Sequence, residues 1–396
     1  MGRKKALLVV AGGRGVPDVL PLLYLQPKLV LSITSKEGWD GEKPYFDIAT
    51  GLPDVEVKPL QNVDAYDLDK CMKACRKLCK PYSDTEWEWT FTITSAPKVL
   101  AIAAYEVAKE MGIPCWHIDS QGERIVSLVK KKRVNKQRFF HLSFDEYVGI
   151  QGRTCEEKSG PTSDYRERAL EWTEIAEEMA LSQDTTRLTP ILYTSKKNSD
   201  KVGIINVPIP LGDLEKSPLV KFLVDRGMLY RTNIGTYCFA STNSAQFIGT
   251  GDWLEVYVFH RARLARFADD CHWAYSIIKD MPTLDSDNTK RTKLYLEIDV
   301  AVMYHAQLVI AECKAVDKPF KGDNKFLRDI DAVADLLGRT YVGKVFVTNQ
   351  LGEGQSYETF RRHAEDRNII VVTKEELNDI GNILRTAATR PKYPRK

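Results

Sequence analysis

The chain has 396 residues, 43% of them hydrophobic and 28% charged, which is enough for two or three domains that each bury a core. This composition excludes a disordered or low-complexity chain, and no apolar run reaches the ~18 residues that a membrane-spanning helix needs. The net charge is only +3, so the chain as a whole lacks the basic excess typical of many nucleic-acid-binding proteins. Because no cleavage pattern follows the basic residues near the N-terminus, we expect a cytoplasmic protein with reduced cysteines.

Strand and helix patterns alternate through residues 1–150. The hydrophobic pattern predicts strands at 6–10, 28–33, 89–93 and 115–118, and helices at 16–25, 68–78 and 98–110. Such alternation is typical of a parallel sheet covered by helices, in which ligands bind beyond the carboxyl ends of the strands. The residues that follow the predicted strands are therefore the candidates for ligand binding: Gly12, Gly13, Arg14, Thr34, Ser35, Thr94, Ser95 and Lys98.

The middle of the chain has the pattern of a connector. A polar stretch at 151–163 with glycine and proline predicts a domain boundary, and 165–181 has the pattern of an amphipathic helix. A predicted helix at 214–226, followed by short strands at 229–231 and 236–240, resembles a winged helix. Two interpretations stay open for this segment, a structural connector and a DNA-binding module, and we favour the connector.

From residue 251 onward the order of predicted elements changes from strand–helix alternation to a long helix followed by a hairpin. The pattern predicts helices at 254–268 and 326–337, hairpin strands at 294–303 and 307–315, and a short buried strand at 344–348. This part of the chain therefore differs in its order of elements from residues 1–150.

Charged residues alternate with apolar ones along both predicted hairpin strands. Asp299 lies on the first strand, and Glu312 and Lys314 share one face of the second. If His305 and Ala306 alone form the turn, Asp299 lies directly opposite Glu312. A turn of three residues would shift the register by one and separate the two acids, so the register is a testable expectation.

Two opposed carboxylates repel each other unless a cation lies between them. A hard divalent ion, Mg²⁺ or Mn²⁺, is the natural partner of such oxygen atoms. It would stabilise charge on a phosphoryl oxygen while Lys314 holds a water for in-line attack, and Glu255, near the start of the preceding helix, would complete the site. In the alternative interpretation the acids protect an exposed strand edge from aggregation, and Lys314 is their ion-pair partner.

These residues resemble the core of the PD-(D/E)XK nucleases. The resemblance rests on Asp299, on the tripeptide Glu312-Cys313-Lys314, and on the preceding sequence GDWLE at 251–255. It implies that Asp299 and Glu312 bind metal together with the backbone carbonyl of Cys313. It also implies that Lys314 positions the nucleophilic water and that Glu255 lies at the edge of the metal site.

The loop at 94–98 resembles the ligand loop of CARF domains, the Rossmann-like sensors of cyclic oligoadenylates in type III CRISPR defence. This chain has Ala96 and Pro97 where the family usually has paired glycines. The hydroxyls of Thr94 and Ser95, the amides at the start of the following helix and the ammonium of Lys98 are nevertheless the groups that bind a phosphate.

Together the motifs resemble the CRISPR ancillary nucleases that join one CARF domain to one PD-(D/E)XK domain. We therefore expect a Rossmann-like CARF domain at 1–150, a helical and winged-helix-like connector at 151–250 and a restriction-endonuclease-like α/β domain at 251–396. The resemblance implies a homodimer that cyclic tetra-adenylate switches on as a metal-dependent nuclease. Substrates in this group are single-stranded DNA, single-stranded RNA and supercoiled DNA that becomes nicked.

Two other functions are compatible with the sequence. A ligand-responsive transcription regulator would bind duplex DNA and leave it intact, and an unregulated restriction-type nuclease would cut without a nucleotide activator. The ring size of the activator, the choice between DNA and RNA, the number of metal ions and the degradation of the activator by the CARF domain stay open at this stage.

Overall fold

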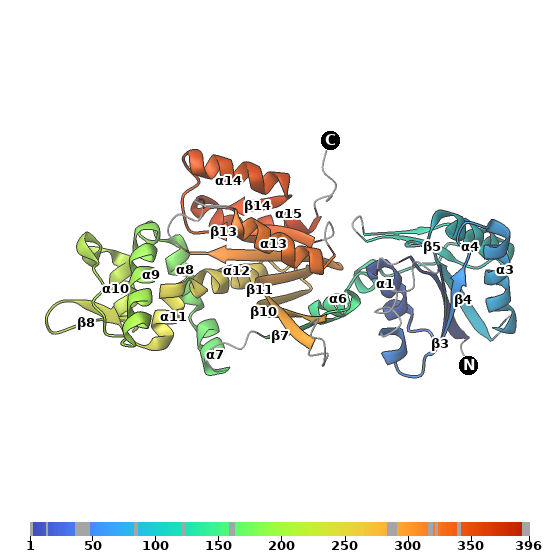
Figure 1. Cartoon of the computed structure of the whole chain (residues 1–396), viewed down its shortest axis with the longest axis horizontal. Coiled ribbons are helices and arrows are strands. Elements are labelled where there is room, and N and C mark those ends of the chain that lie inside the picture. The colour runs from blue at the N-terminus through green and yellow to red at the C-terminus, as the bar shows by residue number, and fades with distance from the viewer. Residues whose placement is uncertain are drawn as a thin grey trace. The chain divides into compact units, whose positions relative to one another are not determined.

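The computed structural model of the chain divides into two compact units (Figure 1). The first comprises Met1–Thr154 and His305–Gln307, and the second comprises Cys155–Tyr304 and Leu308–Lys396. Each unit contains a six-stranded sheet with helices, which confirms the expected α/β fold class. The structure describes residues 3–12, 15–35, 48–82, 86–120, 123–157, 163–282, 291–315, 320, 324–338 and 342–389. Within these ranges, no helix combines the length and apolar character needed to cross a membrane.

The first sheet is Rossmann-like, with the strand order β3-β2-β1-β4-β5-β6. All neighbouring strands are parallel except β6, which is antiparallel to β5. Leu7, Leu8 and Val9 of β1 are fully buried, as expected for a central strand whose two faces are both covered. The strands are β1 (Lys4–Val10), β2 (Leu29–Ser35), β3 (Glu56–Val63), β4 (Trp87–Thr92), β5 (Cys115–Asp119) and β6 (Arg124–Ser127). The helices are α1 (Val16–Leu25), α3 (Leu68–Cys79), α4 (Lys98–Glu110), α5 (Lys136–Phe139) and α6 (Phe144–Ile150).

The elements predicted for this unit are confirmed, and two strands are additional. The predicted strands correspond to β1, β2, β4 and β5, and the predicted helices to α1, α3 and α4. The pattern does not predict β3 and β6, the two strands at the edges of the sheet. β3 has polar residues and Pro59 where a central strand would be continuously apolar, which is the composition of an edge strand.

The second sheet has the order β14-β13-β12-β11-β10-β7. β10 and β11 form a long antiparallel pair, whereas β12, β13 and β14 are parallel to one another. The predicted hairpin strands are β11 and β12, and the pattern does not predict β10. The strands are β7 (Thr154–Glu157), β10 (Asp270–Pro282), β11 (Arg291–Tyr304), β12 (Gln307–Lys314), β13 (Val342–Thr348) and β14 (Ile369–Val372). The helices around it are α7 (Ser163–Glu171), α8 (Thr173–Leu181), α12 (Asp252–Leu264), α13 (Lys325–Leu336), α14 (Gln355–Asp366) and α15 (Ile380–Thr389).

The connector has the element order of a winged helix. It contains α9 (Thr185–Val202), a bridge from Ile209 to Tyr237, η2 (Gly212–Lys216), α10 (Pro218–Asp225), the hairpin of β8 (Leu229–Arg231) and β9 (Tyr237–Phe239), and α11 (Thr242–Thr250). The helix predicted at 214–226 is divided before Pro218, because proline suits the first position of a helix and the Ser217 hydroxyl caps it by accepting from the Leu219 N–H at 3.1 Å. The helix predicted at 165–181 is likewise divided, at Trp172, into α7 and α8.

The connector and the second sheet share one hydrophobic core. Buried side chains of this single cluster extend from Tyr165 in α7 and Leu219 in α10 to Val300 in β11 and Leu384 in α15. The connector is therefore packed as part of the second unit. The three-part division of the chain at 150 and 250 stays a prediction.

The packing of β13 against α15 predicts a local effect on stability. A Cβ atom at Gly343 would lie 2.8 Å from the Ala387 carbonyl oxygen and 2.9 Å from a Val309 methyl group. We expect Gly343→Ala to lower the free energy of unfolding by about 1–3 kcal/mol, because strand and helix would have to separate. Gly149→Ala in α6 is the matched control, since nothing lies within 4 Å of its Cβ position. Thermal denaturation should show a lower melting temperature for Gly343→Ala alone, and an unchanged one would contradict the packing.

Candidate active site

The hairpin of β11 and β12 brings the acidic residues together. β11 ends at Tyr304 and β12 begins at Gln307, so two residues form the turn. Both turn residues are left-handed, with φ of 45° at His305 and 62° at Ala306, as in the two-residue turns that favour asparagine and glycine. The predicted two-residue turn is therefore confirmed, although the sequence His305-Ala306 is unusual for it.

Asp299 and Glu312 are joined by the Lys314 ammonium. Asp299 Oδ2 accepts from the Cys313 N–H at 2.7 Å and from Lys314 Nζ at 3.2 Å. The same Nζ lies 2.6 Å from Glu312 Oε1, and Asp299 is only 6% exposed. The residues predicted from the strand pattern thus meet in space. The alternative placed these acids on an edge strand, and this part is wrong, because β11 and β12 both lie in the interior of the sheet. Its other part, that Lys314 is the ion-pair partner of the acids, is confirmed.

Burial and the interactions between the charges shift the pKa values of Glu312 and Lys314. Burial, followed by the charge of Asp299, raises the pKa of Glu312 to about 7 against the attraction of Lys314. Burial lowers the pKa of Lys314, but the charges of Asp299 and Glu312 outweigh it and hold that pKa above its ordinary value. The ammonium therefore stays protonated at neutral pH, and Lys314 acts as a cation and hydrogen-bond donor.

Glu255 lies in the first turn of α12, on the side of the sheet that α12 covers. α12 packs on the face that contains Cys313, and the Lys314 side chain points to the opposite face. Burial raises the pKa of the Cys313 thiol, and the charges of Asp299 and Glu255 raise it further, so the Glu255 carboxylate lies within electrostatic reach of β12. Trp273 Nε1 donates to Glu255 Oε2 at 2.9 Å. Trp273 is a residue that the sequence analysis missed, because its strand was not predicted.

Gly251 allows the start of α12 to approach the end of β12. Its φ of 105° is left-handed, and a Cβ atom there would lie 3.0 Å from Cβ of Ala315, the residue after Lys314. The glycine of GDWLE is therefore explained by this close contact. The contact places Glu255, in the first turn of α12, near the strand that carries Lys314.

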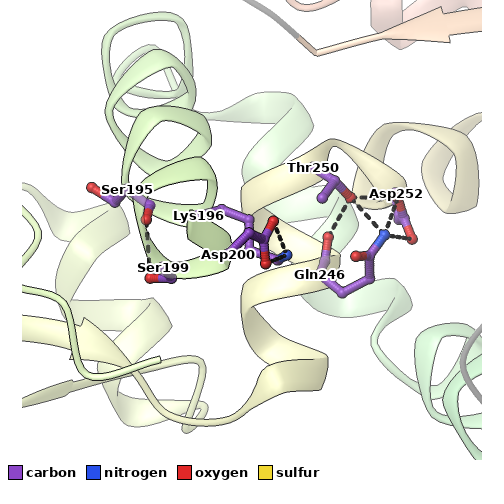
Figure 2. A network of polar contacts seen from close by, with 7 residues as sticks. All are labelled: Ser195, Lys196, Ser199, Asp200, Gln246, Thr250 and Asp252. Atoms are coloured by element: carbon purple, nitrogen blue, oxygen red, sulfur yellow. Dashed lines mark hydrogen bonds and ion pairs between the residues drawn. The ribbon is translucent and has the colours of Figure 1, made fainter. Parts of the chain in front are cut away.

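Asp252, the first residue of α12, is the centre of a polar network (Figure 2). The Thr250 hydroxyl donates to Asp252 Oδ1 at 2.7 Å, and Gln246 Nε2 donates to Asp252 Oδ2 at 3.2 Å. The Tyr165 hydroxyl donates to the same Oδ2 at 2.5 Å. A carboxylate at the start of a helix is also favoured by the helix dipole. This network fixes the junction of α11 and α12 and, with it, the helix that carries Glu255.

The oxygen atoms at the cluster are of the kind that a hard divalent ion prefers as ligands. They are the carboxylates of Asp299 and Glu312 and the Cys313 carbonyl, which accepts from Lys314 Nζ at 3.2 Å. Over the described residues, no three histidine, cysteine, aspartate or glutamate side chains are grouped closely enough to hold an ion. Lys314 lies between the two acids instead. The donor set fits Mg²⁺ or Mn²⁺ by its chemistry, and Lys314 supplies the counter-charge in this arrangement.

In the first unit, the predicted ligand loops meet where the strand order reverses between β1 and β4. A Cβ atom on Gly12 would lie 1.7 Å from the Ser95 carbonyl oxygen, so the loops after β1 and β4 are in direct contact. The Ser95 hydroxyl donates to Asp18 in α1, and Thr94 Oγ1 accepts from the Ile118 N–H at 2.8 Å. Sheets of this kind bind ligands at this position.

The other predicted ligand residues differ in their surroundings. Thr34 and Ser35 are buried at the end of β2, where the Thr34 hydroxyl donates to the Ser35 carbonyl at 3.3 Å. Lys98 is exposed at the start of α4. Gly13 and Arg14 lie outside the described residues. The binding role of all these residues stays a prediction.

Comparison with protein families gives one match. Residues 242–390 match the family model of the Card1-like endonuclease domain. The matched segment contains the proposed site residues Glu255, Asp299, Glu312 and Lys314. None of the curated proteins matches the sequence.

Solved structures share the fold of the whole chain. Protein VC1899 from Vibrio cholerae has a TM-score of 0.76 at 18% identity, over 98% of this chain and 99% of that one. Can2 from Sulfobacillus thermosulfidooxidans, solved in complex with cyclic tetra-adenylate, has a TM-score of 0.70 at 16% identity, over 96% of this chain and 97% of that one. A type III CRISPR defence DNA nuclease activated by cyclic oligoadenylate has a TM-score of 0.50 at 14% identity, over 100% of this chain and 53% of that one. The resemblance inferred from the motifs is thus confirmed: the chain shares its fold with these structures, one of which is a type III CRISPR defence DNA nuclease, and its residues 242–390 are similar to Card1-like endonuclease domains.

Proposed function

We propose that this protein is a metal-dependent endonuclease of type III CRISPR defence that a cyclic oligoadenylate activates. The observation that carries the proposal is the meeting of Asp299, Glu312 and Lys314 on interior strands of a segment similar to Card1-like endonuclease domains. Cyclic tetra-adenylate is the proposed activator, because Can2, which shares the fold over nearly its whole length, was solved with this ligand.

The proposed catalytic residues would have different roles in phosphodiester hydrolysis. Asp299, Glu312 and the Cys313 carbonyl would hold Mg²⁺ or Mn²⁺, with Glu255 at the edge of the site. Such an ion neutralises charge on the phosphoryl oxygen and helps to ionise a water. Lys314 orients the attacking water or a phosphate oxygen through its N–H groups, since its pKa keeps it protonated. The burial of Asp299 strengthens these charge interactions by excluding bulk water.

The proposed activator site lies at the carboxyl end of the first sheet. Thr94 and Ser95 follow β4, and the start of α4 offers free N–H groups and the exposed Lys98 ammonium to a phosphate. A ring with two-fold symmetry suits a homodimer, in which each subunit presents the same loops. Activator binding would favour one arrangement of the two nuclease domains over another.

The test of this function is cleavage of labelled single-stranded DNA, single-stranded RNA and supercoiled plasmid, with and without Mn²⁺ and cyclic tetra-adenylate. We expect cleavage only when both are present. DNA is the first substrate to examine, because a structural neighbour is a DNA nuclease. Binding of duplex DNA without cleavage would favour the transcription regulator, and cleavage without nucleotide would favour an unregulated nuclease.

Substitution of the site residues tests the assignment. We expect Asp299→Ala, Glu312→Ala and Lys314→Ala each to lower the cleavage rate by about a hundredfold or more, because the first two remove carboxylates that would hold the metal ion and the third removes the ammonium that would orient the attacking water. Binding of cyclic tetra-adenylate, measured by calorimetry, should be unchanged, since these residues lie in the second unit.

The matched control is Lys344→Ala. Lys344 is a partly buried lysine on the adjacent strand β13, opposite Ile310, and it pairs with Asp331 at 2.7 Å. This variant should cleave as the wild type does. Full activity in any of the three site variants would refute the assignment.

Lys98 provides a direct test of the activator site. We expect Lys98→Ala to raise the concentration of cyclic tetra-adenylate needed for half-maximal activity by about tenfold, because a hydrogen bond to a charged group contributes about 1.5–3 kcal/mol. Thr94→Ala and Ser95→Ala should act in the same direction. Lys109→Ala at the other end of α4 is the control, since that lysine is exposed and pairs with Glu106. Unchanged sensitivity in all three loop variants would place the activator elsewhere.

A further inference from the structure

The strand β10 departs from regular geometry directly opposite Asp299. β10 and β11 pair with the same register on both sides of this point, which places Ala274 opposite Asp299. Ala274 has a φ of 53°, in the left-handed region that is unfavourable for residues other than glycine by about 1–2 kcal/mol. Strained residues of this kind persist only where their neighbours hold them, and they are concentrated at functional sites.

Arg166 of α7 holds this irregular segment. Its guanidinium donates to the carbonyl of Trp273 at 2.5 Å and to that of Ala274 at 3.4 Å. It also lies over the rings of Trp273 and Tyr275, 5.3 and 5.7 Å from their centroids, and pairs with Glu157 at 3.3 Å. A planar guanidinium can stack on aromatic rings and satisfy two carbonyls at the same time. The Arg166 side chain is only 18% exposed, so these contacts are largely protected from water.

The indole N–H of Trp273 donates a hydrogen bond to Glu255. The side chain is 3% exposed, and Nε1 donates to Glu255 Oε2 at 2.9 Å. A hydrogen bond to a carboxylate is shorter and stronger than one between neutral groups. Trp253 offers a contrast on α12: it is also buried, but its Nε1 has no hydrogen-bond partner among the described residues. Of these two buried indoles, that of Trp273 donates to the Glu255 carboxylate, so the pair allows a matched comparison.

We propose that Trp273 is a positioning residue for the nuclease reaction. Its indole fixes the carboxylate of Glu255, which we place at the edge of the acidic site. Arg166 in turn fixes Trp273 by donating to the carbonyls of Trp273 and Ala274, which flank the left-handed φ of Ala274. This inference rests on the proposed function, because Glu255 has a role only if the cluster holds a metal ion. Groups that orient metal-binding residues typically change metal affinity or activity by about 10–100-fold.

The experiment compares Trp273→Phe with Trp253→Phe in the full-length protein. Both substitutions keep an aromatic ring and remove one indole N–H, and only the first N–H contacts Glu255. Mn²⁺ binding is measured by electron paramagnetic resonance of the free ion, and cleavage of DNA is measured with saturating cyclic tetra-adenylate. We expect Trp273→Phe to weaken Mn²⁺ binding by about tenfold and to lower kcat with little change in KM for DNA. Trp253→Phe should match the wild type in both measurements.

A double-mutant cycle separates positioning from a general structural effect. If Trp273 acts through Glu255, Trp273→Phe causes no further loss in a Glu255→Gln background. Losses that add in full would show that Trp273 acts independently of Glu255. Melting temperatures of the two tryptophan variants identify any loss that comes from unfolding.

The two levels of the proposal fail in different ways. The positioning role is overturned if Trp273→Phe binds Mn²⁺ and cleaves as the wild type does, or if the losses in the cycle are fully additive. The proposed nuclease function would still stand in that case, provided that Asp299→Ala is inactive. A wild-type protein that neither binds Mn²⁺ nor cuts nucleic acid with activator would overturn both.

Discussion

The ammonium of Lys314 between the carboxylates of Asp299 and Glu312 is the interaction on which the proposed chemistry of the second unit depends. Burial of an uncompensated charge is unfavourable by several kcal/mol, so acids on interior strands require a cation nearby. One ammonium faces two carboxylates here, which leaves an excess of negative charge. Such an excess would favour binding of a further cation, and Lys314 offsets part of the negative charge in this arrangement.

Rigid elements hold the residues around this charge cluster. Two strands carry Asp299 and Lys314, and the helix α12 reaches them because Gly251 permits close contact with Ala315. Asp252 anchors the start of α12 through groups from other helices, including the Tyr165 hydroxyl. Sites built on strands and helices hold their geometry better than sites built on loops. The charged side chains are thus arranged before any ligand arrives.

The parts of this arrangement that depend on local pattern could be predicted from the sequence. Alternation along β12 placed Glu312 and Lys314 on one face, and the short interval between the two strands determined the register that sets Asp299 beside them. The parts that depend on contacts between distant segments could not. The strand β10 lacks a regular alternation, and the contact of Trp273 with Glu255 lies beside a left-handed residue at position 274 that no residue preference indicates. In the first unit, the bond from Ser95 to Asp18 likewise joins loops that are far apart in the sequence.

The buried core of the second unit extends beyond the segment that matches the family model. The segment that is recognisable by family begins at residue 242, but Tyr165, Met179 and Leu219 already belong to the same buried cluster as Trp253 and Val300. A fragment cut at the family boundary would leave the apolar surface of α12 open to water, and burial of that surface is what stabilises the helix. The segment that matches the family model is therefore smaller than the segment that shares its buried core. The elements between Tyr165 and Thr250 therefore help to support the second sheet, because their buried side chains belong to its core.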